Sequence, residues 1–302
     1  MSRIRPRAGW LVPVLLALAL VGTACGDGGN EGGTGTAGGA GGGAGAEAPE
    51  HPEGSTMAEI QAAGTMTVGT KFDQPLFGLK RATTGEIEGF DVEIARLIAE
   101  AIGPDVEVEF VETPSAVREQ ALENGDVDMV VATYTINDAR KQRVGFAGPY
   151  YVAGQDIMVP AGNPLGIEGV EDLNGKRVCS VAGSTSIENV REMAPEAEVT
   201  EFDVYSKCAD AMGDGRVDAV STDNVILLGL VEASDGEFEL VGNPFTSEPY
   251  GIGVAKDDTE FRAFINDTLE ELYQSGEWAE AYERTVGKVD DEVPEPPEID
   301  RY

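Results

Sequence analysis

The chain has 302 residues, enough for one large domain or for two modest domains that each bury a core. It carries 55 acidic and 21 basic residues, and the resulting net charge of −34 repels nucleic-acid phosphates and anionic lipids. The charge also has a simpler explanation, because it confers solubility, for example in a salty habitat.

The N-terminus has the order of a secretory signal. A basic segment, Met1–Arg7, precedes an apolar run, Trp10–Val21, which is too short to span a bilayer. The motif that ends at Cys25 resembles a bacterial lipobox, although Gly22 stands where that pattern prefers Leu, Val or Ala. We therefore expect Cys25 to carry a lipid after cleavage and to anchor the protein to the outer face of the cell membrane. A free cysteine after an ordinary signal is the alternative.

A glycine-dominated stretch follows the lipobox, from Gly26 to about Ala48. It has almost no apolar bulk and cannot bury a core, so it predicts a flexible tether. His51, the only histidine of the chain, lies just beyond this stretch. Its position excludes Ser-His-Asp, Cys-His and histidine-metal chemistry inside the fold.

Beyond the tether, short β-branched runs alternate with helical patterns, which predicts α/β lobes on largely parallel sheets. Phe90–Ile102 has apolar residues at helical spacing before Gly103, so we expect a helix that covers one sheet face. Pro114–Asn124 predicts a second helix, closed by Gly125. The first strands are expected at Thr67–Thr70, Val106–Val111 and Val127–Ala132.

The second half of the chain repeats this alternation. Asp214–Asp218 echoes Asn124–Asp128, and an apolar strand is predicted after each, either as an internal repeat or as a coincidence between recurring α/β units. The strands expected here are Arg177–Val181, Val199–Phe202, Ala219–Ser221 and Phe238–Val241. The helices expected here are Ser184–Met193, Cys208–Met212, Val225–Val231 and Glu260–Thr285.

The end of the chain differs from the rest. Asp290–Tyr302 has many acidic residues, three prolines and no apolar period. This composition predicts a disordered tail.

Two cysteines remain for the fold, Cys179 and Cys208, since Cys25 belongs to the lipobox. Pairing is favoured in a secreted chain, and two separate buried thiols are the alternative. Closing a loop of 29 positions would stabilise the fold by roughly 3–4 kcal/mol. A catalytic thiol is not expected, because no histidine is available to activate it.

Six segments together carry a family resemblance: Gly69–Lys71, Gly89–Ala95, Asn124–Arg140, Gly183–Thr185, Asp223 and Glu248–Val254. In this order and spacing they resemble the bacterial family 3 extracellular solute-binding proteins, which serve polar amino acid importers. The resemblance spans about Met66 to Gly287, and Lys71–Pro75 and Cys179–Thr185 look closest to the actinobacterial glutamate-binding branch. It implies a type II periplasmic-binding-protein fold, with two α/β lobes, each a sheet flanked by helices.

The resemblance implies that a free amino acid is held by its two charged ends. Arg140 matches the family arginine that grips the α-carboxylate in a two-pronged contact, and Asp223 matches the carboxylate that accepts the α-ammonium. Because the two come from different lobes, one ligand bridges them and stabilises the closed form. The alternatives are a solvated helix-start arginine and a simple N-cap. Further expected site residues are Thr133, Thr135, Ser184 and Thr185.

Three positions bear on the ligand side chain. Relatives that bind glutamate and aspartate place a basic residue after Gly-Thr, then a serine and an arginine before the second helix, where this chain has Lys71, Ser115 and Arg118. Two cations at one pocket favour an anionic ligand, each charge-assisted contact contributing roughly 1.5–3 kcal/mol. Arg118 has a second interpretation, as a helix-surface residue paired with a nearby glutamate. Phe72 either walls the ligand or packs in the core.

We therefore expect a monomeric substrate-binding component of an ABC importer, without cofactor or metal, that captures glutamate and possibly aspartate outside the cell. Glutamine or another polar amino acid is the alternative ligand. A dehydratase-like cleft enzyme and a sensor that presents its ligand to a receptor are alternatives of other classes, although the acids show no acid/base pattern.

The chain must leave the first lobe and return to it, so hinge segments are expected at Gly154–Pro160 and Glu248–Gly253. The expected divisions are a signal peptide (1–24), a lipidated cysteine and tether (25–57), a first lobe (58–153), a second lobe (154–249), the return to the first lobe (250–288) and the acidic tail (289–302).

Overall fold

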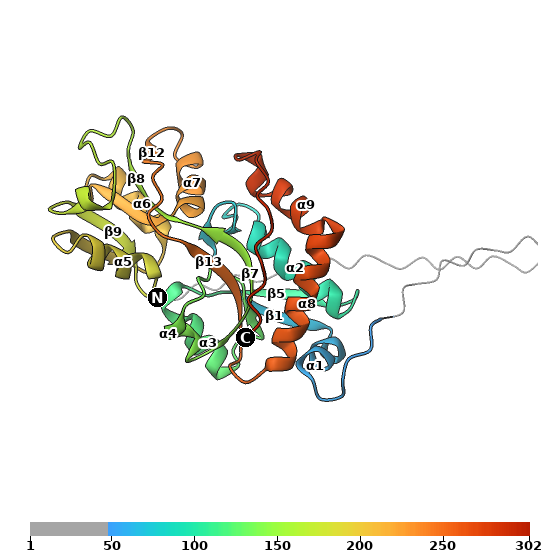
Figure 1. Ribbon diagram of the computed structural model, residues 1–302. Coiled ribbons are helices and arrows are strands. Elements are labelled where there is room, and N and C mark those ends of the chain that lie inside the picture. Colours follow the sequence, from blue (N-terminus) through green and yellow to red (C-terminus); the bar gives the residue numbers. More distant parts are fainter. Residues whose placement is uncertain (1–47) are drawn as a thin grey trace, which may run out of the picture. The chain divides into compact units, whose positions relative to one another are not determined.

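The computed structural model describes residues 48–302 (Figure 1). The predicted signal, the lipobox with Cys25 and most of the glycine-rich tether lie outside the described residues. Within residues 48–302, every helix is too short or too polar to cross a membrane.

Two five-stranded sheets form the frames of two lobes, with the orders β5-β1-β6-β13-β7 and β10-β9-β11-β8-β12. Each begins with three parallel strands and continues with an antiparallel neighbour, β13 or β8. The first sheet contains β1 (Thr65–Thr70), β5 (Glu107–Glu112), β6 (Met129–Val130), β7 (Gly145–Ala153) and β13 (Glu248–Val254). The second contains β8 (Gln155–Pro160), β9 (Arg177–Val181), β10 (Glu198–Phe202), β11 (Ala219–Asp223) and β12 (Phe238–Leu240). The two strands that follow the sequence echo, β6 and β11, take the same central place.

Helices pack on both sheets (Figure 1). The first lobe has α1 (Thr56–Ala63), α2 (Phe90–Ile102), η1 (Ser115–Val117), α3 (Arg118–Asn124), α4 (Asp138–Lys141), α8 (Thr259–Ser275), α9 (Glu277–Arg284) and η3 (Val286–Lys288). The second has η2 (Val170–Leu173), α5 (Thr185–Met193), α6 (Tyr205–Gly213) and α7 (Asn224–Glu232). The helix predicted at Glu260–Thr285 is two helices, because Gly276 adopts φ 90° between them.

A small antiparallel sheet of β2 (Asp73–Gln74), β3 (Gly78–Lys80) and β4 (Ile87–Glu88) precedes α2. The turn between β2 and β3 forms a hairpin, which we call the β2–β3 hairpin. It belongs to the first lobe in sequence, and β2 also contacts α6 and α7 of the second lobe.

The chain crosses between the lobes twice. Only Gly154 separates β7 of the first sheet from β8 of the second, and β13 returns the chain to the first sheet. An added Cβ at Gly154 would lie 2.9 Å from Pro244 and 3.0 Å from the Thr246 carbonyl oxygen of the returning segment. The expected hinge segments therefore fall at the crossings but are mostly strand, which leaves Gly154 and residues 241–247 as the irregular parts.

The cores of the lobes differ in size and composition. The first lobe has one large cluster rich in aromatic residues, including Phe77, Phe90, Tyr250 and Trp278, and a smaller cluster on the other face of its sheet. The second lobe has two smaller, mostly aliphatic clusters. A disulfide between Cys179 and Cys208 joins β9 to α6 in one of them, which confirms the predicted pairing.

The end of the expected tether lies against the first lobe. His51 Nε2 is 2.7 Å from the Ile102 carbonyl oxygen, and its ring meets Phe264 edge-on. Ser55 caps α1 by accepting from the Ala58 N–H. Residues 48–57 are thus part of the folded lobe, because one imidazole and one cap hold a segment that composition alone assigns to the tether.

The acidic tail, expected to be disordered, also lies against the first lobe. Its residues form no helix or strand, but the Asp300 N–H donates to the Gly148 carbonyl at 2.8 Å. The Tyr302 hydroxyl accepts from the Phe146 N–H at 2.9 Å, and Val293 and Ile299 pack against the core. The expectation of disorder is corrected here, because a few apolar and aromatic anchors can fix a segment whose average composition is polar.

Candidate ligand site

A narrow cavity, which we call the enclosed cavity, lies between the lobes, and its empty volume of about 220 Å³ includes space open to solvent. It lies where the carboxyl ends of β6 and β11 are followed by loops and helix starts, the usual place for ligands in open α/β sheets. The first lobe contributes Ser115, Arg118, Thr133 and Thr135, and the second contributes Ser184, Thr185, Ser186, Tyr205, Thr222, Asp223 and Ile226. Seven of the ten residues expected at the ligand therefore line one cavity.

Asp223 ends β11 and is the residue before α7. It occupies the N-cap position, but its side chain makes no capping hydrogen bond, so the simple N-cap interpretation does not hold. Its Oδ2 accepts from the Tyr250 hydroxyl at 2.6 Å, whereas Oδ1 is buried without a hydrogen-bond partner among residues 48–302. Burial, followed by repulsion from Glu248, raises the pKa of Asp223 to about 7. An unpartnered carboxylate oxygen in a cavity is a site for a cationic group.

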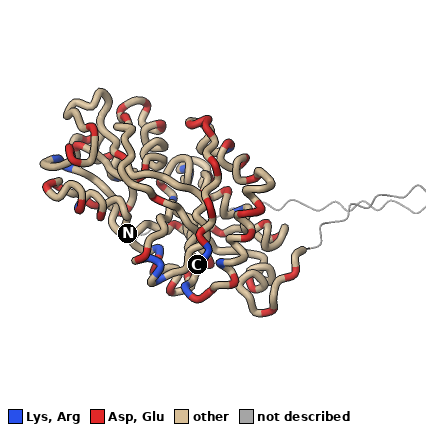
Figure 2. Tube along the Cα trace, viewed as in Figure 1, with Lys and Arg blue, Asp and Glu red and all other residues tan. Residues whose placement is uncertain are grey.

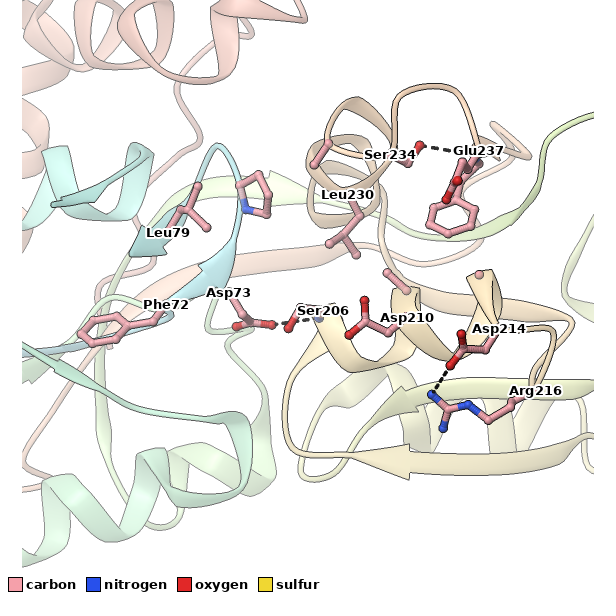
Figure 3. Close-up of a pocket in the computed structure, with 15 residues that line it drawn as sticks. Phe72, Asp73, Leu79, Ser206, Asp210, Asp214, Arg216, Leu230, Ser234 and Glu237 are labelled. Atoms are coloured by element: carbon pink, nitrogen blue, oxygen red, sulfur yellow. Dashed lines mark hydrogen bonds and ion pairs between the residues drawn. The ribbon is translucent and has the colours of Figure 1, made fainter. Parts of the chain in front are cut away.

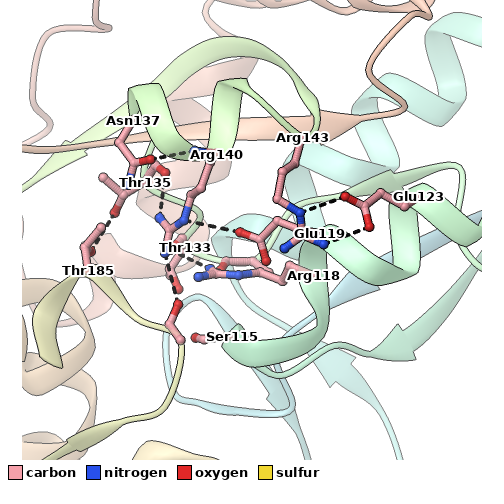
Figure 4. Close-up of polar contacts among 12 residues, drawn as sticks. Ser115, Arg118, Glu119, Glu123, Thr133, Thr135, Asn137, Arg140, Arg143 and Thr185 are labelled. Carbon is pink, nitrogen blue, oxygen red and sulfur yellow. Dashed lines mark hydrogen bonds and ion pairs between the residues drawn. The ribbon is translucent and has the colours of Figure 1, made fainter. Parts of the chain in front are cut away.

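Arg140 lies on α4 with only 8% of its surface exposed, so it is not a solvated helix-start arginine. Its Nη1 donates to the Thr135 carbonyl at 2.7 Å, and its Nη2 donates across the lobes to the Gly183 carbonyl at 3.2 Å. Its Nε lies 3.4 Å from Glu119 Oε1 (Figure 4). Burial, with repulsion from Arg118, lowers the pKa of Arg140 to about 10.

Arg140 does not line the enclosed cavity itself. It borders an adjoining open pocket, and the two spaces share the side chains of Ser115, Ser184 and Thr185. Its charge nevertheless reaches the cavity, because Arg140 and Arg118 both act to lower the pKa of Asp223. The two charged groups expected to hold an amino acid thus face neighbouring parts of one interlobe space.

Arg118 and Lys71 are both buried on the first lobe, 2% and 3% exposed. Arg118 Nη1 donates to the carbonyls of Ala132 and Thr133 at 2.9 and 3.3 Å, and its guanidinium lies 4.1 Å from the Tyr134 ring centroid. It is therefore not a helix-surface residue. Lys71 Nζ donates to Ser115 Oγ at 2.7 Å, and burial followed by repulsion from Arg118 lowers the pKa of Lys71 well below its usual value. Both cations donate to neutral oxygens.

Phe72 is placed elsewhere than either interpretation expects. It borders an open groove between the β2–β3 hairpin and the helices α6 and α7 (Figure 3). The Lys80 ammonium lies 5.0 Å from its ring centroid. Phe72 therefore neither walls the enclosed cavity nor packs in the core.

The sequence matches the family model of the bacterial extracellular solute-binding proteins, family 3, over residues 66–288. The chain belongs to this family. Residues 48–302 contain no cluster of three or more His, Cys, Asp or Glu side chains that could hold a metal ion.

Relatives of this solute-binding protein share most of its length. Glutamate-binding protein GluB of Corynebacterium efficiens is 41% identical over 236 residues, which are 74% of this chain and 80% of the relative. The ABC transporter glutamine-binding protein GlnH of Bacillus subtilis is 42% identical over 233 residues, 76% of this chain and 84% of the relative. A solved structure of an ancestral arginine-binding protein bound to glutamine is 40% identical, with a TM-score of 0.70 over 74% of this chain and 98% of that one. The predicted family and two-lobe fold are confirmed.

Sequence reasoning about this solute-binding protein missed the support behind its site. Thr133 adopts φ 44°, a region that β-branched residues rarely enter. Its N–H donates to Asp91 Oδ2 at 2.8 Å, and its hydroxyl donates to Gln74 at 3.0 Å. The other Asp91 oxygen accepts from Tyr150 at 2.5 Å. Burial raises the pKa of Asp91 to about 6. An acid at the start of an apolar helix was the only signal available.

Glu248 was also missed as a site residue. It begins β13, where the chain returns to the first lobe, and is only 3% exposed. Its Oε2 accepts from the Thr185 hydroxyl at 3.0 Å, and its Oε1 accepts from Asn189 at 3.2 Å. The Thr185 hydroxyl in turn lies 3.4 Å from that of Thr135 on the first lobe. Glu248 thus ties a crossing segment to the cavity wall.

Proposed function

We propose that this solute-binding protein captures glutamate, with aspartate as a second ligand, outside the cell and delivers it to an ABC permease. The observation that carries the proposal is the distribution of buried charge. Lys71, Arg118 and Arg140 come from the first lobe, and Asp223 with its unpartnered oxygen comes from the second. An acidic amino acid has two carboxylates for these cations and one ammonium for the unpartnered oxygen of Asp223, whereas the buried acids Glu119 and Glu248 already have partners in the protein.

Each charged group of the ligand then has a partner. Asp223 Oδ1 accepts from the α-ammonium, and Arg140 binds the α-carboxylate with help from the backbone N–H of Thr185. Lys71 and Arg118 bind the side-chain carboxylate. An arriving carboxylate also offsets the repulsion between Lys71 and Arg118, which a neutral amide cannot do to the same extent.

The relatives support an amino acid ligand but differ in which one, since one is named for glutamate and another for glutamine. The buried cations favour glutamate for this chain. Acidic residues are spread over both lobes (Figure 2), so the long-range field does not attract an anion. Selectivity must then arise from the cations buried at the cavity.

The same proposal includes the route to the membrane. The signal-like N-terminus and the motif ending at Cys25 support export and attachment by a lipid, which keeps the captured ligand near its permease. A mature chain whose mass shows an unmodified Cys25 would contradict this part alone.

The ligand assignment is tested by a thermal-shift screen against the twenty amino acids, followed by calorimetry with glutamate and glutamine. Wild type should bind glutamate at least about 10-fold more tightly than glutamine. Lys71→Met keeps the side-chain length but removes one cation, so it should weaken glutamate binding about 10-fold or more and leave glutamine binding nearly unchanged.

Lys80→Met is the matched control, because Lys80 is an exposed lysine on the neighbouring strand β3. It should bind both ligands as wild type does. Equal affinity of wild type for glutamate and glutamine, or an unchanged preference in Lys71→Met, would contradict the assignment of the side-chain site.

A further inference from the structure

The β2–β3 hairpin of the first lobe reaches the start of a helix in the second lobe. Asp73 Oδ2 accepts from the backbone N–H of Tyr205 at 2.7 Å and from that of Ser206 at 3.3 Å. These are the first two residues of α6, and Asp73 lies 132 positions away in sequence. Figure 3 shows the Asp73 carboxylate directed at the start of this helix.

Helix α6 lacks a cap from its own segment. Val204 occupies its N-cap position, and no side chain there forms a capping hydrogen bond. The first N–H groups of a helix have no partner within it, and a carboxylate placed there also interacts favourably with the helix dipole. Asp73 therefore does for α6 what an N-cap residue does in most helices, but from the opposite lobe.

A second contact, between Pro75 of the same hairpin and Gly229 of α7, also joins the two lobes. An added Cβ at Gly229 of α7 would lie 2.5 Å from the Pro75 carbonyl oxygen, so only a glycine allows this approach. Gly229 is buried within a regular helix, where alanine would otherwise be preferred. Neither Asp73, Pro75 nor Gly229 lines the enclosed cavity.

We propose that Asp73 is an interlobe latch, a positioning residue that stabilises the closed arrangement of the lobes without touching the ligand. Rotation about the crossings at Gly154 and residues 241–247 would separate Asp73 from α6, and water would then solvate the helix start. The latch therefore contributes only when the lobes are together. Because ligand is held by both lobes, a larger closed fraction raises its apparent affinity and slows its release. This inference rests on the proposed function only in requiring an amino acid between the lobes.

The first test compares Asp73→Ala with wild type, using whichever of the twenty amino acids stabilises wild type most. The dissociation constant should rise about 5-fold, through faster dissociation and not through slower association. Melting without ligand should stay nearly unchanged, because the open form does not use the cap. Asp203→Ala is the matched control, since Asp203 also precedes α6 but is exposed and pairs with Lys207 of its own lobe. It should bind as wild type does.

A second variant, Gly229→Ala, distinguishes an effect on lobe closure from an effect on folding stability. Alanine should leave melting without ligand unchanged or raise it, because it favours helix α7, yet it should weaken binding by blocking the approach of Pro75. If Asp73→Ala instead lowers melting without ligand and leaves the dissociation rate unchanged, the cap serves folding and the latch is wrong. If wild type binds no amino acid, the proposed function fails. The latch then predicts that wild type is more compact than Asp73→Ala and Gly229→Ala in small-angle scattering. Equal compactness of the three proteins would overturn the latch.

Discussion

The two lobes have the same strand order, yet they face the cavity with opposite charge. The first lobe supplies buried cations on loops and short helices: Arg118 lines the cavity, and Lys71 and Arg140 lie beside it. The second supplies hydroxyl groups and the carboxylate of Asp223 at the end of β11. Glu119 pairs with Arg140 within the first lobe, but Lys71 and Arg118 donate to neutral oxygens, and Asp223 Oδ1 has no hydrogen-bond partner among residues 48–302. A ligand with both signs of charge can therefore pair with the buried cations and with Asp223 at once, and this pairing joins the lobes.

The lobes also differ in what holds them together. Aromatic residues fill the core of the first lobe, and Trp278 donates from its indole nitrogen to the Tyr150 carbonyl there at 2.9 Å. Both lobes have an apolar cluster on each side of the sheet, but the clusters of the second lobe are mostly aliphatic, and one of them contains the disulfide. Small cores commonly depend on such a cross-link. The buried cations thus lie on the lobe with the larger aromatic core, where their burial carries a desolvation cost that an anionic ligand can offset.

The largest effect should come from removing the carboxylate of Asp223, which the second lobe supplies. Asp223→Asn leaves the ligand ammonium without a charged acceptor, which should weaken amino acid binding about 30-fold or more by calorimetry. Melting without ligand at pH 8 should not fall, because the substitution removes a buried charge whose Oδ1 has no hydrogen-bond partner among residues 48–302. Asp210→Asn, an exposed position on α6, should bind as wild type does. If Asp223→Asn bound its ligand as tightly as wild type does, Asp223 would not be the partner of the ligand ammonium.

The next effect concerns the difference in packing. Replacing Cys179 and Cys208 with serine opens a loop with a sequence separation of 29, which should lower the free energy of unfolding by roughly 3–4 kcal/mol in denaturant titrations. In this variant, amide hydrogen exchange should accelerate more in β9 and α6 than in α2 of the first lobe, because the disulfide joins only β9 and α6. An equal loss of protection in both lobes would show that they unfold as one unit.

Local patterns predicted the fold where they were complete within a short segment. Phe90–Ile102 has the same bounds in the structure as in the sequence pattern, because apolar spacing and the following Gly103 are both local signals. Strand β7 was missed, since Gly148 and Pro149 interrupt Gly145–Ala153. A proline is tolerated there because β7 is at the edge of its sheet.

The site divides in the same manner. Arg140 and Asp223 were predicted from segments that resemble a family, together with the cations near them. The supporting contacts were not, because each joins residues distant in sequence: Asp91 and Thr133 are 42 positions apart, and Thr185 and Glu248 are 63 apart. The Asp73 contact with α6 is more distant still. Such pairs follow from how the lobes dock, which no local periodicity encodes.

The smallest effect is a pH dependence of ligand binding that arises from Asp223 of the second lobe and not from the cations of the first. Asp223 has a pKa of about 7 without ligand, so lowering the pH from 8 to 7 protonates about half of the molecules and removes their acceptor for the ammonium. The dissociation constant should rise about 2-fold over this pH unit, and binding near pH 7 should release a proton that calorimetry in two buffers detects. Stability without ligand should change oppositely. Because the folded pKa lies above the ordinary value of 3.8, the folded chain holds a proton that the unfolded chain releases, and this contribution to stability is lost as the pH rises toward 7. Asp223→Asn should flatten the binding profile, whereas Lys71→Met should not. A wild-type affinity that does not vary between pH 5 and 8 would mean that Asp223 is already ionised without ligand or does not meet the ammonium.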